Sequence, residues 1–171
     1  MTVGFRNNSI SQYINDSPPG GLHFTLVDST MLVNGGAGGP ANIFASALLM
    51  PNFNDIDNDG DMDLVVANCF DAAQNNNLYT NNGNDNNWVT ISCVGTMSNK
   101  SAIGAVVKVL ATINGEPTWQ MAQISGQTGY CGQNMLPAHF GLGDATIIDS
   151  VYIYWPSGYV DIATNLPINQ F

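Results

Sequence analysis

The stretch DIDNDGDMDLVVAN, residues 55–68, places an acidic side chain at every odd position from Asp55 to Asp63 and then becomes apolar. Five like charges in so short a segment repel one another, and this lowers stability unless a cation neutralises them. Calcium takes about six to eight oxygen ligands, and Gly60 permits the sharp turn that lets alternate side chains converge on one ion. The spacing therefore predicts a calcium site.

The predicted ligands are the side chains of Asp55, Asp57, Asp59 and Asp63 and the backbone carbonyl of Asp61. An EF-hand loop opens in the same way, but it closes with a glutamate at its twelfth position, where this chain has Val66. We therefore expect the loop to close at Asp63 and to continue directly into a strand. A magnesium site and a solvated acidic turn without metal are the alternatives.

The composition restricts the partners of the chain. Of 171 residues, 44% are hydrophobic and only 9% are charged, with a formal net charge of −10. Nucleic acids and anionic membrane surfaces are disfavoured, because binding to phosphate needs a basic footprint that three basic residues do not supply. The apolar runs are too short to span a bilayer, which takes roughly 18 residues or more, so we expect no membrane insertion.

Short apolar runs rich in Val, Ile, Tyr and Trp are bounded by turn residues, which is typical of strands. The predicted strands are His23–Val27, Leu64–Ala67, Trp88–Val94, Ala105–Leu110, Trp119–Ile124 and Ser150–Trp155. Residues Ile43–Met50 fit either a helical turn or a buried strand. The Asn-rich run 81–87 has no apolar side chain to bury and predicts a domain boundary. We therefore expect an all-β chain with domains at residues 1–86 and 87–171.

Two family resemblances support this division. Residues 52–68, followed by NNLYTNNG at 76–83, resemble an FG-GAP/VCBS-type repeat, and GFRNN and HFTLVDST resemble parts of neighbouring repeats. The second half resembles the ASPIC/UnbV domain in the segments NWVTISCVG, SNKSAIGAVVKV, GQTGY, HFGLGDA and VYIYWPSG. The two occur together in cartilage acidic protein-like extracellular proteins. The resemblance implies a propeller-blade-like β-sheet with a calcium loop, followed by a sandwich-like or barrel-like β domain.

Other candidate sites have weaker support in the sequence. We expect no catalytic residue, although Cys131 and His139, with Asp144 or Asp149, are the candidates for a nucleophile, a base and an orienting acid. Cys69, Cys93 and Cys131 allow one disulfide or three free thiols. Sequons at Asn7, Asn15 and Asn99 allow glycosylation. The aromatic residues of the second half could form either part of the core or a sugar-stacking platform, depending on whether they are buried or exposed. They are Trp88, Trp119, Trp155, Tyr130, Tyr152, Tyr154 and Tyr159.

Together these features predict a non-enzymatic, secreted calcium-binding module with a structural or adhesive role. An isolated propeller-like blade exposes sheet edges, and exposed edges pair with other chains. We therefore expect a homo-oligomer or homopolymer, as in a surface filament, sheath or layer. A glycan- or protein-binding accessory domain of a larger secreted protein is the alternative.

Overall fold

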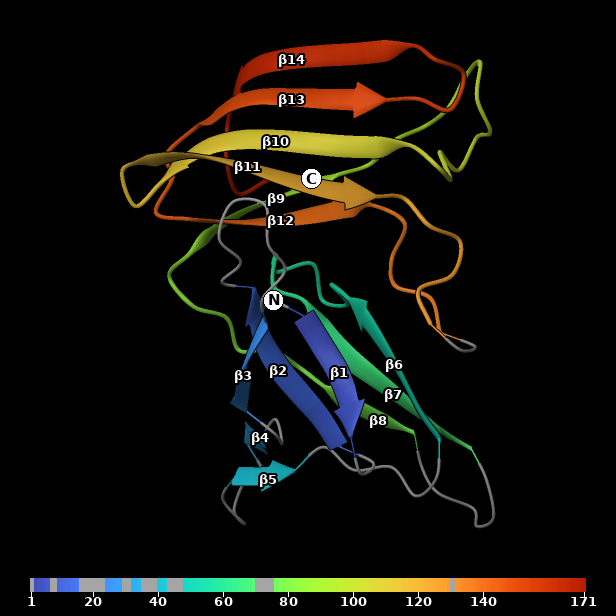
Figure 1. The fold of residues 1–171 in the computed structure, drawn as a ribbon, viewed down its shortest axis with the longest axis vertical. Coiled ribbons are helices and arrows are strands. Elements are labelled where there is room, and N and C mark those ends of the chain that lie inside the picture. The colour runs from blue at the N-terminus through green and yellow to red at the C-terminus, as the bar shows by residue number, and fades with distance from the viewer. Residues whose placement is uncertain are drawn as a thin grey trace. The chain divides into compact units, whose positions relative to one another are not determined.

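The computed structural model describes residues 2–6, 9–15, 24–28, 32–34, 40–42, 48–69, 76–129 and 132–171 (Figure 1). Every regular element in this part of the chain is a β-strand, and no helix occurs there. The chain divides into two compact units, one of residues 1–51 and 65–79 and the other of residues 52–64 and 80–171. The predicted all-β class is therefore confirmed for the described residues, whereas the boundary at residue 87 stays a prediction.

Small sheets contain the described strands up to residue 79. An antiparallel sheet has the order β1 (Thr2–Arg6), β2 (Ser9–Asn15) and β3 (Phe24–Asp28). A second antiparallel pair consists of β4 (Leu32–Asn34) and β5 (Pro40–Asn42). A third sheet has the order β6 (Leu48–Asn54), β7 (Asp63–Cys69) and β8 (Asn77–Tyr79). The acidic loop joins β6 to β7, so the predicted passage from Asp63 directly into a strand is confirmed.

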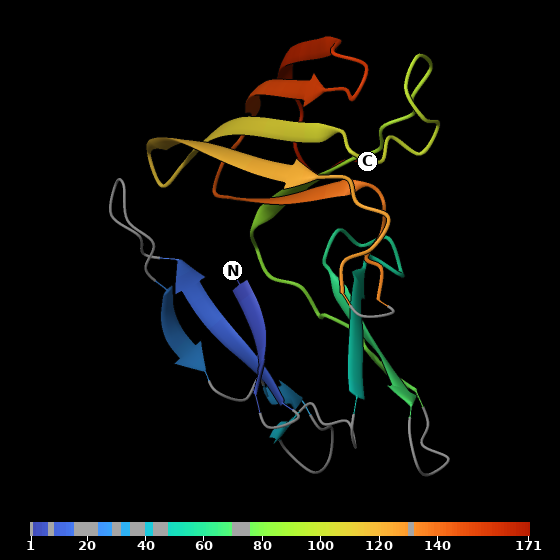
Figure 2. The same ribbon diagram turned by 45° about the vertical axis from the view of Figure 1, so that its right-hand side comes forward.

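Two sheets form the larger, second unit, one above the other in Figure 2. The four-stranded antiparallel sheet has the order β11 (Glu116–Gln123), β10 (Val106–Ile113), β13 (Ile148–Tyr154) and β14 (Val160–Leu166). The other sheet pairs β9 (Asn87–Ile91) with β12 (Ala138–Gly143), also antiparallel. A hairpin turn at Asn114 and Gly115 joins β10 to β11; both residues have positive φ, as an Asn-Gly hairpin turn requires.

The hydrophobic core of this unit receives side chains from both sheets. Strand β10 alternates between buried and partly exposed positions over most of its length, because successive side chains of a strand point to opposite faces. Its inward-facing residues belong to the same core cluster as those of β9 and β12. The buried cluster comprises Val89, Ala102, Ala105, Val107, Val109, Ala111, Ile124, Ala138, Phe140, Leu142, Ala145, Ile148 and Val151. This shared core fixes which residues of each sheet face outward.

All six strands predicted from apolar runs are strands in the structure, with ends that differ by up to a few residues. Of the ambiguous segment Ile43–Met50, residues 48–50 belong to β6, and the preceding residues lie outside the described part. The apolar runs did not predict β1, β2, β4, β5, β8, β12 or β14. Glycines interrupt the apolar pattern of AHFGLG, and Asp161, Thr164 and Asn165 interrupt that of VDIATNL, which lies at an edge of its sheet.

Candidate metal centre

The acidic loop turns sharply between β6 and β7. Asn58 has a φ of +60° and Gly60 a φ of +95°, so two positions adopt the left-handed conformation that Asn and Gly tolerate best. The loop also contains Asx-type hydrogen bonds: the Asp59 N–H donates to Asp57 Oδ1 at 3.3 Å, and the Asp61 N–H donates to Asp59 Oδ1 at 2.9 Å. The spacing of short acidic residues thus folds the loop locally.

Three of the five loop carboxylates meet at one place. One carboxylate oxygen from each of Asp55, Asp57 and Asp63 lies within 4.8 Å of the others. Asp57 is exposed and Asp55 is half-buried, whereas Asp63 is only 1% exposed. Burying a carboxylate beside two others is costly unless hydrogen bonds and a cation compensate, so this arrangement could hold a metal ion.

Backbone N–H groups orient two of these carboxylates. Asp63 Oδ2 accepts from Ile56 at 2.9 Å and Asp63 Oδ1 accepts from Asn81 at 2.8 Å. Asp55 Oδ2 accepts from Gly60 at 3.1 Å. Asp55 Oδ1, in contrast, is buried and has no hydrogen-bond partner among the residues that the structure describes. A buried carboxylate oxygen without a partner is the position at which a bound cation would satisfy it.

Asp59 and Asp61 lie outside this group of three, and their predicted role as ligands stays a prediction. The Asp61 carboxylate is directed toward Gly83, because a Cβ atom added at Gly83 would lie 2.5 Å from Asp61 Oδ2. Burial raises the pKa of Asp61, and the charge of Asp59 raises it further, against the opposing effect of His139. A cation in the loop would counteract this unfavourable charge.

The loop packs against the outer face of the β9–β12 sheet. Val89 and Phe140 point into the core, so Trp88, Thr90 and His139 face the other way. Thr90 is nevertheless only 1% exposed. Gly60 covers part of this face: it is buried so close to Trp88 that a Cβ atom would overlap the indole ring.

Trp88 and His139 form a small aromatic group beneath the loop. Their rings are stacked with centroids 6.1 Å apart, and Phe171 meets Trp88 edge-on at 5.2 Å. The His139 Nδ1 and the Thr90 hydroxyl are 3.0 Å apart, which fixes the orientation of the imidazole. Burial lowers the pKa of His139, and the charges of Asp55 and Asp61 partly offset this shift.

A second contact holds the end of β6. The Phe53 N–H donates to Asn134 Oδ1 at 3.0 Å, and the Met135 N–H donates to the Phe53 carbonyl at 3.3 Å. The Gln133 N–H donates to the side chain of Asn52. The loop thus contacts the larger unit at two places, the end of β6 and the turn at Gly60. These contacts explain why residues 52–64 belong to the same compact unit as residues 80–171.

The candidate catalytic residues do not form a triad among the described residues. His139 bonds Thr90, whereas the Asp144 carboxylate accepts from the Asn114 N–H at 2.6 Å and Asp149 accepts from the Thr112 hydroxyl at 3.5 Å. Cys131 lies outside the described part, as do His23 and the side chain of Cys69. Cys93 is a free, half-buried thiol, and burial raises its pKa, with a further contribution from Asp161.

Sequence reasoning missed Trp88 and Asn81 as neighbours of the loop. The Asn-rich run that contains Asn81 was interpreted only as a boundary, yet the run also forms Asx-type turns, with Asn81 Oδ1 accepting from the Gly83 N–H at 3.2 Å. Asn87 reaches across the unit to donate to the Ala145 carbonyl at 3.0 Å. The high propensity of Asn for Asx-type turns is the sequence signal that could have predicted an ordered loop at residues 81–87.

Comparison with known proteins identifies the C-terminal part. Residues 95–171 match the family model described as ASPIC and UnbV, while no FG-GAP repeat is detected. No curated protein and no solved structure matches the chain. Within the described residues, no helix is long and apolar enough to cross a membrane. Residues 95–171, with β10 to β14 and most of the core, are therefore an ASPIC and UnbV domain.

Proposed function

We propose that this chain is a non-enzymatic, extracellular structural module in which Asp55, Asp57 and Asp63 bind one calcium ion. The observation that carries the proposal is the buried Oδ1 of Asp55, which lies beside two other carboxylates and has no partner in the described part of the chain. The ion would replace the missing hydrogen bond, neutralise the loop and hold Gly60 against Trp88.

The donor set favours calcium over other metals. The three grouped donors are carboxylates, and neither histidine nor cysteine belongs to the group within the described residues. Zinc and copper sites use nitrogen and sulfur ligands, whereas calcium prefers oxygen. Asp57 is exposed, so water and loop carbonyls can complete the coordination. Magnesium is less well suited, because it retains its waters and uses few protein ligands.

The resemblance of residues 52–68 to an FG-GAP/VCBS-type calcium loop adds support. In that interpretation β6, β7 and β8 are the strands of a propeller-like blade, and the sheets of the second unit form a sandwich-like accessory domain. Secretion follows from the same resemblance, because these repeats and the ASPIC/UnbV domain occur together in extracellular proteins. Calcium at millimolar concentration outside cells would then keep the loop folded.

Calcium binding is tested by thermal unfolding and titration calorimetry in calcium, in magnesium and in a chelator. At a calcium concentration of 100 times Kd, binding to the folded state alone adds about 2.7 kcal/mol. For a chain of this length we expect Tm to rise by about 5–10 °C. Asp55→Asn and Asp57→Asn should abolish the rise.

Glu116→Gln is the matched control, because Glu116 is an exposed acidic residue at the start of β11. It should retain the full calcium response. A Tm that is identical in calcium and in chelator, with no heat of binding, would refute the proposal. A response to magnesium equal to that to calcium would refute the assignment of the metal.

Self-association of this module is the second part of the proposal. The described sheets have unpaired outer edges, with β11 and β14 at the two ends of the four-stranded order. Such edges pair readily with another strand. Sedimentation velocity in calcium should therefore show oligomers that grow with concentration, and a monomer at every concentration would contradict this part alone.

A second candidate function is a ligand-binding accessory domain of a larger secreted protein. The observation in its favour is a group of exposed aromatic side chains on the four-stranded sheet. Trp119 is 53% exposed and Tyr154 is 39% exposed, which is unusual for large rings that only stabilise a core.

A further inference from the structure

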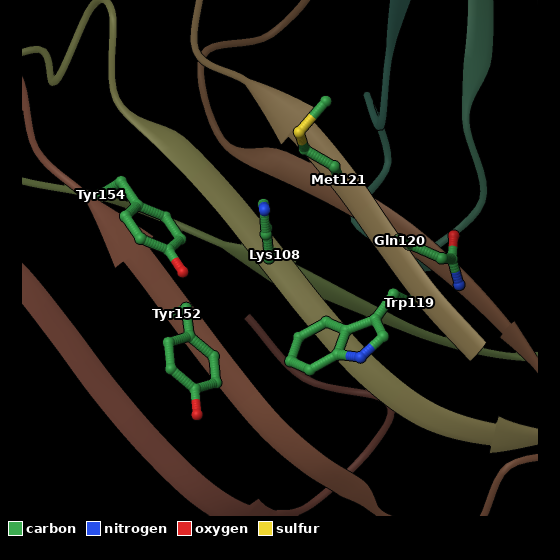
Figure 3. Close-up of a pocket in the computed structure, with 6 residues that line it drawn as sticks. All are labelled: Lys108, Trp119, Gln120, Met121, Tyr152 and Tyr154. Atoms are coloured by element: carbon green, nitrogen blue, oxygen red, sulfur yellow. The ribbon is translucent and has the colours of Figure 1, made fainter. Parts of the chain in front are cut away.

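The outer face of the four-stranded sheet carries a shallow pocket of about 360 Å³ (Figure 3). It is lined by Lys108, Trp119, Gln120, Met121, Tyr152 and Tyr154. Strand register explains the grouping, because Lys108 on β10 pairs with Met121 on β11 and with Tyr152 on β13. Ligand pockets commonly have volumes of about 300–1,000 Å³, so this pocket suits a small ligand.

The pocket side chains face away from the core. Val107 and Val109 on β10 are fully buried, so Lys108 between them points outward. Trp119 and Met121 occupy outward-facing positions of β11 and remain 53% and 67% exposed. Gln120 contributes differently, since its side-chain amide donates to the Gly141 carbonyl at 2.7 Å on the other side of the sheet.

The aromatic rings form a platform around Lys108. The rings of Tyr152 and Tyr154, neighbours on the same face of β13, are nearly parallel, with centroids 6.3 Å apart and an interplanar angle of 16°. Trp119 meets Tyr152 edge-on at 5.6 Å. These contacts hold the rings in place while leaving Trp119 and Tyr154 substantially exposed.

Lys108 supplies a hydrogen-bond donor at the centre of this platform. Its Nζ lies 5.3 Å from the centroid of the Tyr154 ring, and no carboxylate pairs with it among the described residues. The chain has 3 basic and 13 acidic residues, so a strongly anionic polymer would be repelled overall. A neutral ligand with an apolar face and several hydroxyl groups fits this combination best.

We propose that the pocket formed by Lys108, Trp119, Tyr152 and Tyr154 binds a neutral oligosaccharide. The C–H face of a pyranose ring would lie on the exposed rings, and the ammonium group would donate to a hydroxyl or a ring oxygen. This inference deepens the second candidate function and rests on it. The pocket contains no residue of the acidic loop, so the sugar test and the calcium test fail separately.

The test uses tryptophan fluorescence and calorimetry on the whole chain in calcium, with cellohexaose, mannohexaose and galactan oligosaccharides as neutral probes. Hexagalacturonate is the charged comparison. We expect at least one neutral probe to bind, and Trp119→Ala to weaken its binding by about tenfold or more. Lys108→Met should weaken it by about two- to tenfold, the effect of losing one hydrogen bond.

Tyr159→Ala is the matched control, because Tyr159 is 64% exposed and lies outside the pocket. It should leave sugar binding unchanged. Trp119→Phe keeps an aromatic ring and should retain part of the affinity for the sugar. It therefore distinguishes the loss of a sugar contact from a failure of the Trp119→Ala variant to fold. The absence of binding to every neutral probe, binding of hexagalacturonate alone, or a dimer that Trp119→Ala dissociates without any sugar effect would each overturn the proposal.

Discussion

Replacing Gly60 by alanine tests whether the acidic loop is fixed to the β9–β12 sheet. Gly60 combines a φ of +95° with a buried position, and an added methyl group would overlap the indole ring of Trp88. Gly158 provides the matched control. It has a φ of +89°, but a Cβ atom added there meets nothing within 4 Å.

The two variants share one energetic cost and differ in another. The left-handed conformation costs an alanine roughly 1–2 kcal/mol at either position. Only at Gly60 must the loop or the Trp88 ring also move, and forcing extra volume into a packed site costs typically about 1–3 kcal/mol. We therefore expect Gly60→Ala to lower the free energy of unfolding by about 2–5 kcal/mol, and Gly158→Ala by about 1–2 kcal/mol.

Urea unfolding in calcium, followed by tryptophan fluorescence, measures both losses. The emission of Trp88 should also change in folded Gly60→Ala, because the ring loses its cover, and the calcium-dependent rise in Tm should shrink. Gly158→Ala should keep the native emission and the full calcium response. Equal losses of stability in the two variants would refute the inferred contact between the loop and the sheet.

Two further predictions concern the buried carboxylate of the loop and the histidine that the loop covers. Asp63→Asn should lower the free energy of unfolding by about 2–3 kcal/mol and abolish the calcium response. The reason is that an amide NH₂ would face one of the two N–H donors of the buried carboxylate. A variant with wild-type stability in urea would contradict this prediction. Burial lowers the pKa of His139 below 6.5, so its contribution to stability is complete above that pH and is lost as the pH falls through the lowered value. In the presence of a chelator, the free energy of unfolding should therefore fall more for the wild type than for His139→Gln when the pH is lowered from about 7.5 to about 5.5. An equal fall in the two proteins would contradict the prediction.

Local chemistry accounts for what could be predicted from the sequence. The alternating aspartates and Gly60 predicted a turn, and Asn58 and Gly60 do adopt positive φ. The runs around Val107 and Val151 predicted strands, because β-branched residues fit a pleated, half-buried surface. The Asn-Gly pair at residues 114 and 115 adopts the positive φ values of a hairpin turn, for which these two residue types have a strong preference.

Contacts between distant segments could not be predicted in the same way. The apolar run Trp88–Val94 predicted a strand that contains Trp88, but nothing in its neighbours indicated that Gly60 would cover it. The carboxylates of Asp59 and Asp61 are as suitable for calcium as those of their neighbours, yet only three of the five meet in the structure. Backbone donors orient the buried Asp63 carboxylate, and one of these donors, the Asn81 N–H, comes from a segment 18 residues away along the chain.

The position of the loop determines what a bound cation would stabilise. Asp55 and Asp63 are oriented by the loop itself and by Asn81, while Gly60 packs on Trp88 and Phe53 bonds Asn134. All of these residues belong to the second compact unit. Because a metal that binds only the folded loop adds its binding free energy to folding, calcium would stabilise the β9–β12 face together with the loop. The charge repulsion that weakens the metal-free loop would then make the stability of the adjoining domain depend on calcium.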